Sequence, residues 1–574
     1  MPIVRRVLLV VSVLALCVFA WLWWTRPVKV DMATYVPADS IVYLEANSLP
    51  EIFGAVTSTD DWRELAPAAG VEVGPGAGGW LARLVSFTGV GPSDSVVLSR
   101  AQVAVAVLGF DAAEEPDAAL KYTPRAALVA ETHTSEWRAK AAVEKLVGDF
   151  ARRSLGAGAA ERKEVEGVSF YVWGAPSGER RKVVAAVSES VAVVGNDEAA
   201  VRACLDVRRG ARPSLAGSEQ LKEMRARLGA DGALAFGFAP QGSAAKVVEV
   251  FAPAFVGGVT EDVHIQSLLA TLLPQLTNRV VGSAGWSSRV AGGRVEDDYF
   301  LSLPGEMAER LQAPLAPGAG EESSAADFLP PDVYQFSRYD FRSPEAAWRG
   351  LNAALSSQVD VTMAIGVTRA LDGLLKPYGI EQPRDFLRAC GPEVATARLE
   401  EESEGKVLVT RVRDRAALDA QVRAYLRRDA RAERVGDADI LVSKDPERGA
   451  AAFVGDYLLL GPEGDVRRCV GAHLEGRTLK GAVAFKAAAQ DFFDAPPFAL
   501  TLTDDRDSAR STLSYFARRG DARPAQGGQA ALEEALARRA YSVGETRLAD
   551  GGFEKRTRSA FGLFGEIVTR FAPR

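Results

Sequence analysis

Apolar residues alternate with polar or small ones in several short segments, and this period of two is typical of β-strands. Clear examples are AQVAVAVLGF (101–110), PRAALVAET (124–132) and KVVAAVSESVAVVG (182–195). Strands that follow one another directly, at 101–132 and 165–195, favour antiparallel hairpins over a parallel sheet. Helical patterns separate these strands, so the sequence predicts an α+β fold.

Two helices are predicted from apolar residues that recur every three or four positions. The first begins after a cap at Thr134 or Ser135. Its predicted apolar face consists of Trp137, Ala141, Val143, Leu146 and Phe150. The second begins after Asp414, and its face consists of Leu418, Val422 and Tyr425. We expect both faces to pack against the sheet.

One segment near the start is apolar throughout. Val7 to Trp24 reads VLLVVSVLALCVFAWLWW, eighteen residues without a charge. At about 1.5 Å per residue, a helix of this length crosses most of a hydrocarbon core that is roughly 30 Å thick. Arg5 and Arg6 precede the segment, and tryptophans close it where the membrane interface would lie. The pattern predicts a transmembrane signal anchor at 7–24 after a short cytoplasmic N-terminus, 1–6.

Other export signals explain this segment less well. A cleavable signal peptide would be cut after Ala20, but apolar residues continue beyond that point. Cleavage stays open as an alternative. A lipoprotein would need a small residue before Cys17, where Leu16 stands. A lone N-terminal anchor by default leaves the body outside. The sequence therefore predicts a single-pass inner (cytoplasmic) membrane protein with its C-terminal body in the periplasm or extracellular space.

The part of the chain after the anchor repeats itself. Residues 185–224 align with residues 452–488. The matched positions include Gly195 with Gly461, Val201 with Val466, Cys204 with Cys469 and Gly217 with Gly481. A second pair, 289–307 and 547–567, has the pattern strand, Gly-Gly turn, strand in both copies. Such internal similarity predicts two copies of one module.

The repeats also set the expected domain boundaries. We expect a first α+β module at 33–310 and a second at 328–572. Between them, 311–327 is rich in Pro, Gly, Ala and Ser and has too few large apolar side chains to join a core, which predicts a linker. The predicted fold is therefore two duplicated modules of antiparallel sheet packed with helices, preceded by one N-terminal transmembrane helix.

The start of the first module carries a resemblance to a known family. Tyr35-Val36-Pro37-Ala38-Asp39 is followed by the strand-like run IVYLEANSLPEI (41–52), just after the predicted anchor. This arrangement resembles an uncharacterised bacterial family catalogued as domain-of-unknown-function 3352. The resemblance implies a protein associated with the cell envelope. It supplies no catalytic residues.

Composition supports a folded protein and argues against one class of partner. The chain has 574 residues, 47% hydrophobic and 25% charged, which is typical of globular domains and too long for a single core. The formal net charge is −7, and no block of Lys and Arg is long enough to follow a phosphate backbone. We therefore expect no nucleic-acid partner.

Residues that usually perform catalysis or bind metals are scarce. The three histidines, His133, His264 and His473, are scattered, and no HExxH or CxxC spacing occurs. The run from Gly74 to Gly79 satisfies GxGxxG, but Pro75 removes a backbone donor and no clear strand precedes it. We expect a flexible loop there. The sequence predicts no catalytic residue, no cofactor and no metal site.

Cysteines and acidic clusters each leave an alternative open. Cys204 and Cys469 occupy equivalent positions, where burial is expected, although a disulfide between the two copies is an alternative. Cys390 would then stay unpaired. The clusters 296–298 and 400–402 are interpreted as solvated strand ends or turns, with weak cation binding as the alternative.

A non-enzymatic envelope protein is the first functional hypothesis, because two related modules occur without a recognisable catalytic set. It would bind or scaffold a protein or cell-wall partner through a surface shared by the copies. A hydrolase-like enzyme with a divergent carboxylate site, and a component of an export or surface-assembly machine, are the alternatives. A deep pocket that gathers charged residues such as Glu45, Asp298 or Arg338 would favour the enzyme.

Overall fold

A computed structural model describes most of the chain after residue 27. The described ranges are 28–71, 97–114, 120–176, 181–257, 263–318, 324–373, 375–402, 405–427, 430–493, 496–519, 528–538 and 541–565. The predicted anchor at 7–24 and the glycine-rich run at 74–79 lie outside these ranges. Within them, no helix combines the length and the apolarity that crossing a bilayer requires.

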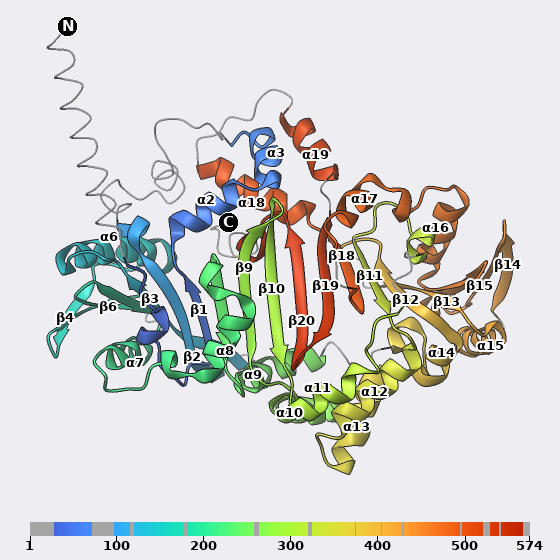
Figure 1. Cartoon of the computed structure of the whole chain (residues 1–574), viewed down its shortest axis with the longest axis horizontal. Helices are drawn as coiled ribbons and strands as arrows, with labels where there is room; N and C mark the ends of the chain where they lie inside the picture. Colours follow the sequence, from blue (N-terminus) through green and yellow to red (C-terminus); the bar gives the residue numbers. More distant parts are fainter. Residues whose placement is uncertain are drawn as a thin grey trace, which may run out of the picture.

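The described residues form twenty β-strands in a single sheet (Figure 1). The strands of the first half are β1 (Val42–Ala46), β2 (Gln102–Glu114), β3 (Leu120–Glu131), β4 (Glu161–Val165), β5 (Val168–Gly174), β6 (Lys182–Ser188), β7 (Val191–Gly195), β8 (Ala235–Ala239), β9 (Ala284–Ala291) and β10 (Arg294–Ser302). Those of the second half are β11 (Gln335–Asp340), β12 (Cys390–Arg398), β13 (Val407–Val412), β14 (Arg431–Val435), β15 (Ala438–Val442), β16 (Ala450–Val454), β17 (Tyr457–Gly461), β18 (Ala499–Asp504), β19 (Tyr541–Ala549) and β20 (Gly552–Ser559).

The two halves of this sheet share one strand order. The pairings run β4-β5-β6-β7-β3-β2-β1-β8-β9-β10 in the first half. They run β14-β15-β16-β17-β13-β12-β11-β18-β19-β20 in the second. All are antiparallel, so the hairpins predicted at 101–132 and 165–195 are confirmed. The Gly-Gly turns after Ala291 and near Gly551 also connect hairpins as predicted.

The predicted fold of two duplicated sheet modules is wrong, because the last strands of the halves pair with each other and make one sheet of twenty strands. β10 and β20 are antiparallel over eight residue pairs, from Val295 with Ser559 to Ser302 with Gly552. A Cβ at Gly552 would lie 2.1 Å from the carbonyl oxygen of Leu301, so glycine permits this close approach. Each hairpin would otherwise expose an unpaired edge. Sequence periodicity shows which residues form strands, but not which distant edge pairs with them.

Helices cover both faces and both ends of the sheet (Figure 1). In the first half they are α2 (Leu49–Thr57), α3 (Asp60–Ala68), α6 (Glu136–Leu155), α7 (Glu198–Arg208), α8 (Glu219–Leu228), α9 (Ser243–Gly257), α10 (Val263–Val280) and α11 (Gly305–Gln312). In the second half they are α12 (Pro344–Ser356), α13 (Val361–Gly373), α14 (Pro383–Ala389), α15 (Arg415–Leu426), α16 (Glu463–Leu474), α17 (Val483–Ala489), α18 (Arg506–Arg519) and α19 (Gly528–Arg538).

The hydrophobic cores follow the alternation of side chains along the strands. In the first half, Val184 and Ala186 pack with α7 and α8, whereas Ala185 and Val187 pack with α6 on the opposite face. The second half repeats this arrangement, with α16 and α17 on the first face and α14 and α15 on the other. We call the side that carries α8 and α17 the front face, which Figure 1 shows toward the viewer.

At the ends of the central strands, helices of one half pack on helices of the other. At the upper ends of the strands in Figure 1, Trp62 and Leu65 of α3 share a core with Leu513 of α18 and Leu536 of α19. At the lower ends, α10 and α11 share a core with α12. The upper cluster joins helices that are far apart in the sequence, whereas the lower cluster joins consecutive helices on either side of the boundary between the halves (Figure 1). The halves are therefore held together by the sheet and by two helix clusters.

Two expectations about packing are wrong. Helix α6 buries Val143 as predicted, but it exposes Trp137 and Phe150, at 66% and 53%, and buries small residues such as Ala139 and Ala142 in their place. Small side chains let the helix approach the sheet closely, which apolar spacing alone does not reveal. The predicted linker also joins the cores: Leu315, Ala325 and Ala326 are buried. The face predicted after Asp414 does pack inward, because Leu418 and Val422 are buried.

A buried ion pair lies where the upper helix cluster meets the junction. The side chain of Arg294, the first residue of β10, is 2% exposed. Its Nε lies 3.0 Å from Oδ2 of Asp61 in α3, and its Nη1 lies 2.5 Å from Oδ2 of Asp491 in the second half. We call these three residues the Arg294 cluster. It connects the two halves through side chains of which Arg294 and Asp61 are fully buried and Asp491 is 18% exposed.

Replacing Arg294 should strongly destabilise the protein. In Arg294→Ala, the carboxylate of Asp61 would stay buried without its cation, and removing one partner of a buried pair costs about 3–5 kcal/mol. Urea unfolding followed by circular dichroism measures this loss. The control is Arg310→Ala, whose exposed pair with Glu306 should contribute less than about 1 kcal/mol. Equal stability of the two variants would contradict the role of the Arg294 cluster.

Candidate functional site

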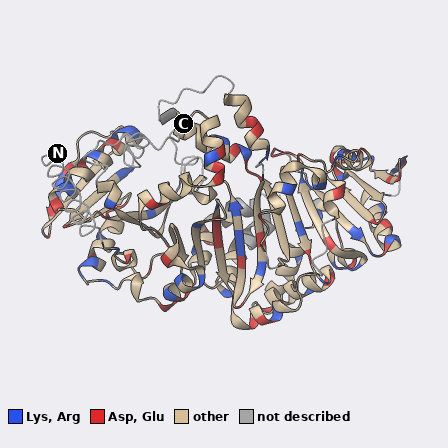
Figure 2. Cartoon of the chain, turned by 45° about the horizontal axis from the view of Figure 1, so that its top comes forward, with Lys and Arg blue, Asp and Glu red and all other residues tan. Residues whose placement is uncertain are grey.

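Opposite charges meet on the front face where β10 pairs with β20. β10 carries Glu296 and Asp298, and β20 carries Arg558 and Arg556 at the directly paired positions. Figure 2 shows the acidic segment of β10 beside the basic segment of β20. Opposite charges at facing positions of an antiparallel pair are stabilising, and like charges are not. The charges therefore match the pairing of these two strands.

Seven side chains form a continuous series of ion pairs across four strands, which we call the junction chain. In order they are Arg558, Glu296, Arg289, Asp298, Arg556, Glu554 and Arg547. Nη1 of Arg289 and Nε of Arg556 lie 2.5 and 3.2 Å from the carboxylate oxygens of Asp298. Arg289 comes from β9 of the first half and Arg556 from β20 of the second. Each central carboxylate is thus shared between the halves.

Arginines form the outer layer of the junction chain, and carboxylates form the inner layer. The side chains of Glu296 and Asp298 are 4% and 6% exposed, whereas those of Arg289 and Arg556 are 36% and 35% exposed. Burial raises the pKa of Asp298, although Arg289 and Arg556 oppose that effect. Burial alone would also raise the pKa of Glu554, but Arg547 and Arg556 outweigh it and hold the pKa below its usual value.

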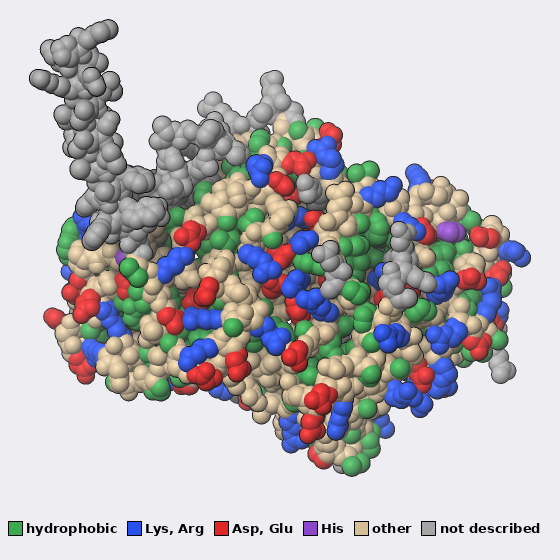
Figure 3. Space-filling view, viewed as in Figure 1, with side chains coloured by type: hydrophobic (Ala, Val, Ile, Leu, Met, Phe, Trp, Pro, Cys, Tyr) green, Lys and Arg blue, Asp and Glu red, His purple; other side chains and the backbone are tan. Residues whose placement is uncertain are grey.

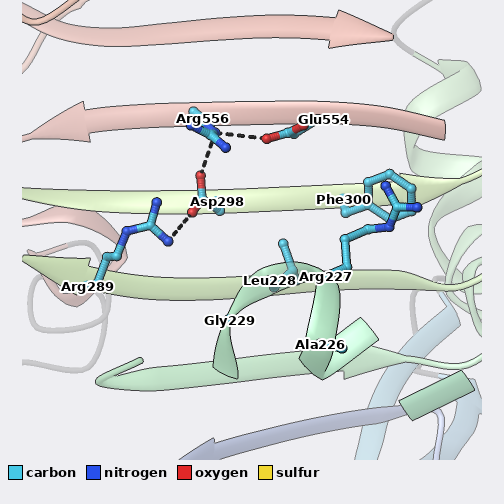
Figure 4. Close-up of a pocket in the computed structure, with 9 residues that line it drawn as sticks. All are labelled: Ala226, Arg227, Leu228, Gly229, Arg289, Asp298, Phe300, Glu554 and Arg556. Atoms are coloured by element: carbon cyan, nitrogen blue, oxygen red, sulfur yellow. Dashed lines mark hydrogen bonds and ion pairs between the residues drawn. The ribbon is translucent and has the colours of Figure 1, made fainter. Parts of the chain in front are cut away.

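A pocket of about 350 Å³ opens over this series of charges, and we call it the junction pocket. The residues that line it are Ala226, Arg227, Leu228, Gly229, Arg289, Asp298, Phe300, Glu554 and Arg556. Figure 4 shows Arg289 and Arg556 reaching Asp298 from opposite sides, with Arg227 beside Phe300. The end of α8 forms one wall. The pocket is therefore built by both halves.

Arg227 differs from the other arginines of the junction pocket. Its guanidinium carbon lies 4.1 Å from the centre of the Phe300 ring, and the residue is exposed. Among the ion pairs between described residues none involves Arg227, whereas Arg289 and Arg556 both pair with Asp298. The space-filling view also shows basic side chains at the surface over the central strands (Figure 3). The pocket thus presents positive charge beside one apolar ring, which suits an anionic group.

Glu45, Asp298 and Arg338 would have favoured an enzyme if they had gathered in one deep pocket. Only Asp298 lines the junction pocket. Glu45 is 7% exposed and is held by the Tyr43 hydroxyl at 2.6 Å and by Arg225 at 2.9 Å. Arg338 lies in the second half and pairs with Asp340 and Glu393. These residues hold separate structural ion pairs and do not converge on one site.

The interpretation of 296–298 as a solvated strand end is wrong. Glu296, Asp297 and Asp298 lie in the middle of β10 and are 3%, 2% and 4% exposed. Arginines of β9 and β20 pair with Glu296 and Asp298 on the front face, whereas Asp297 on the opposite face accepts hydrogen bonds from the Trp286 indole and the Leu563 amide. The cluster at 400–402 does lie in an exposed turn. No group of three or more His, Cys, Asp or Glu side chains in the described part of the chain could hold a metal ion.

The remaining candidate residues occupy structural positions. Cys204, Cys390 and Cys469 are buried as free thiols, and Cys204 and Cys469 lie in separate cores, so they form no disulfide. His133 lies two residues after the end of β3, where its ring contacts the side chain of Gln102. His473 contacts the carbonyl of Asp327 and stacks on Phe328. The side chain of His264 is not among the side chains that the structure describes.

A second hollow, of about 460 Å³, lies on the opposite face of the same central strands. Hydroxyl groups line it, from Thr501, Thr503, Ser542, Thr557 and Ser559. Asp504 and Asp505 also contribute to the wall. Burial raises the pKa of Asp505 from 3.8 to about 6, although the amide of Ala560 and the nearby Arg294 oppose this effect. Oδ2 of Asp505 accepts the Ala560 hydrogen bond at 3.2 Å.

Sequence reasoning missed Arg227, Arg289, Glu554 and Arg556. A usable signal was present: the closing hairpins of the two copies match in pattern, but one carries EDD at 296–298 and the other KRTR at 555–558. Opposite charges at matched positions of two repeats are what a pseudo-symmetric contact between them needs.

Comparison with known proteins yields no relative. No family model, no curated protein and no solved structure matches the chain. The resemblance to the domain-of-unknown-function family therefore stays a prediction.

The ion pair between Asp298 and Arg556 should show energetic coupling. Asp298→Asn, Arg556→Gln and the double variant form a cycle, and a pair between a buried carboxylate and a partly exposed arginine should give a coupling of about 1–2 kcal/mol. Urea unfolding measures it. The matched cycle on Glu219 and Lys222 should give less than about 0.5 kcal/mol, because both side chains are well exposed. A coupling energy near zero for Asp298 and Arg556 would show that this ion pair does not help to hold the two halves together.

Asp505 should make stability depend on pH. Its folded pKa of about 6 exceeds the ordinary value of 3.8, so the protonated form favours folding. The contribution is complete below about pH 4 and is lost as pH rises through 6. Asp505→Asn should therefore be more stable than the parent at pH 7, by at most ~3 kcal/mol because solvent screens a partly exposed group, and equally stable at pH 4. Unfolding free energies from pH 4 to 7 test this, and a constant difference would contradict it.

Proposed function

We propose that this chain is a membrane-anchored protein of the cell envelope that binds or scaffolds a partner without catalysing a reaction. The predicted anchor at 7–24 would hold the body at the membrane. The junction pocket would take an anionic group of a protein or a cell-wall polymer. One observation carries the proposal: the exposed layer of the pocket is arginine, and the carboxylates beneath it are already paired.

The state of these carboxylates argues for recognition and against catalysis at this pocket. A general base needs a free lone pair within reach of its substrate. Asp298 forms ion pairs with Arg289 and Arg556, and Glu554 forms ion pairs with Arg547 and Arg556, so arginines engage both carboxylates, although Oδ1 of Asp298 accepts no hydrogen bond. Arginine forks, in contrast, keep donors for a second anion after pairing with the first. Binding is therefore the function that the pocket supports best.

Arg227, which pairs with no carboxylate of the described residues, should contribute directly to the binding of an anionic partner. Arg227→Ala in the full-length protein should lower recovery of an anionic partner roughly tenfold, the loss expected for one charge-assisted hydrogen bond of about 1.4 kcal/mol. Detergent extracts of cells that carry a tagged protein provide the measurement. The control is Arg310→Ala, an exposed arginine on α11 away from the pocket.

Recovery of the tagged protein alone under gentle conditions would contradict this binding function. It would also count against the alternative of an export or surface-assembly component, because both require a partner. Equal recovery by the two variants would instead place the contact elsewhere on the surface.

The hydroxyl-lined hollow on the opposite face favours the hydrolase-like alternative. Asp504 and Asp505 both line it, and the raised pKa of Asp505 is the kind of difference that lets one of two carboxylates act as an acid. Asp504, however, accepts hydrogen bonds from Arg506 at 2.8 and 2.9 Å. Turnover of a cell-wall glycan that disappears in Asp505→Asn would establish this alternative over the first.

A further inference from the structure

An aromatic residue is exposed beside the point where the described chain begins. Trp137 lies in the first turn of α6 and is 66% exposed. The guanidinium carbon of Arg138 lies 5.3 Å from the centre of its ring. The exposed indole leaves a large amphipathic ring available for contact with another surface.

Hydrogen bonds place the beginning of the body next to this turn. The side chain of Gln102 bonds the backbone of Val30 at both its N–H and its carbonyl, at 2.8 and 3.0 Å. The ring of His133 lies 3.0 Å from the same Gln102 side chain. Only two residues separate His133 from the start of α6. Val28, two residues before Val30, is 82% exposed.

The predicted anchor leaves little chain between the membrane and this point. The span ends at Trp24, four residues before Val28. Fully extended, four residues reach at most about 14 Å. The start of the body, and the elements bonded to it, must therefore lie close to the bilayer surface if the anchor is in the membrane.

We propose that the first turn of α6 rests on the bilayer, with Trp137 among the lipid headgroups. This inference rests on the proposed membrane anchor. Indole is amphipathic and favours the membrane interface. Arg138 at the next position supplies positive charge for anionic headgroups, whereas Lys29 already pairs with Glu51 at 3.1 Å. The contact would fix the orientation of the body as well as its distance from the membrane.

The second exposed aromatic of α6 provides a matched control. Phe150 is 53% exposed and lies thirteen residues further along the helix. At about 1.5 Å per residue, this places it roughly 20 Å from Trp137, and thirteen positions at about 100° each turn it to a different side of the helix. A membrane contact at the first turn should not include Phe150.

Labelled full-length protein in vesicles tests the contact. Cys17→Ser removes the thiol of the predicted span, and Cys204, Cys390 and Cys469 are at most 1% exposed and should not react. Trp137→Cys and Phe150→Cys are then labelled singly with a fluorescent maleimide. The vesicles contain phosphatidylcholine, phosphatidylglycerol and a lipid that quenches fluorescence at the headgroup. We expect loss of fluorescence at position 137 and none at position 150.

The outcomes separate this contact from the anchor on which it rests. If the protein does not float with the vesicles, the anchor is absent and both proposals fall. If it floats but position 137 is not quenched, or both positions are quenched equally, the anchor stands and the contact of α6 is overturned. A loss at position 137 that weakens in vesicles of phosphatidylcholine alone would show that the charge of Arg138 takes part.

Discussion

Pairing between β10 and β20 is the interaction on which the rest of the structure depends. Without it, each half would end in a hairpin with an open edge, and open edges pair with other chains. Glu296 and Asp298 on one strand face Arg558 and Arg556 on the other. If β10 paired with β10 of a second chain, Glu296 and Asp298 of the two copies would lie close together and repel each other. The charges therefore favour pairing within the chain over association between chains.

One consequence of this junction is mechanical. The Arg294 cluster and the helix clusters above and below the sheet all cross between the halves, so the body behaves as one unit, although its strand order occurs twice. A scaffold that presents a partner at a fixed place needs such rigidity. The contact proposed for Trp137 would add a fixed orientation relative to the membrane.

The other consequence is chemical. Because the junction chain needs carboxylates beneath and arginines above, the surface that both halves share is positive, even though the whole chain has a net charge of −7. The same side chains thus hold the halves together and form the positive surface to which binding of an anionic group is proposed. The opposite face of these strands carries hydroxyl groups instead, so the two faces of one junction offer different chemistry.

The sequence by itself determined the local elements: strands of period two, the hairpins closed by Gly-Gly turns, the inward face after Asp414, and the burial of Cys204 and Cys469. These depend on residues close together in the chain. Only the tertiary structure decided that the two sheets are one, that 296–298 is buried, and that α6 exposes Trp137. Each of these depends on which distant backbone edge or side chain comes into contact, and periodicity carries no information about such partners.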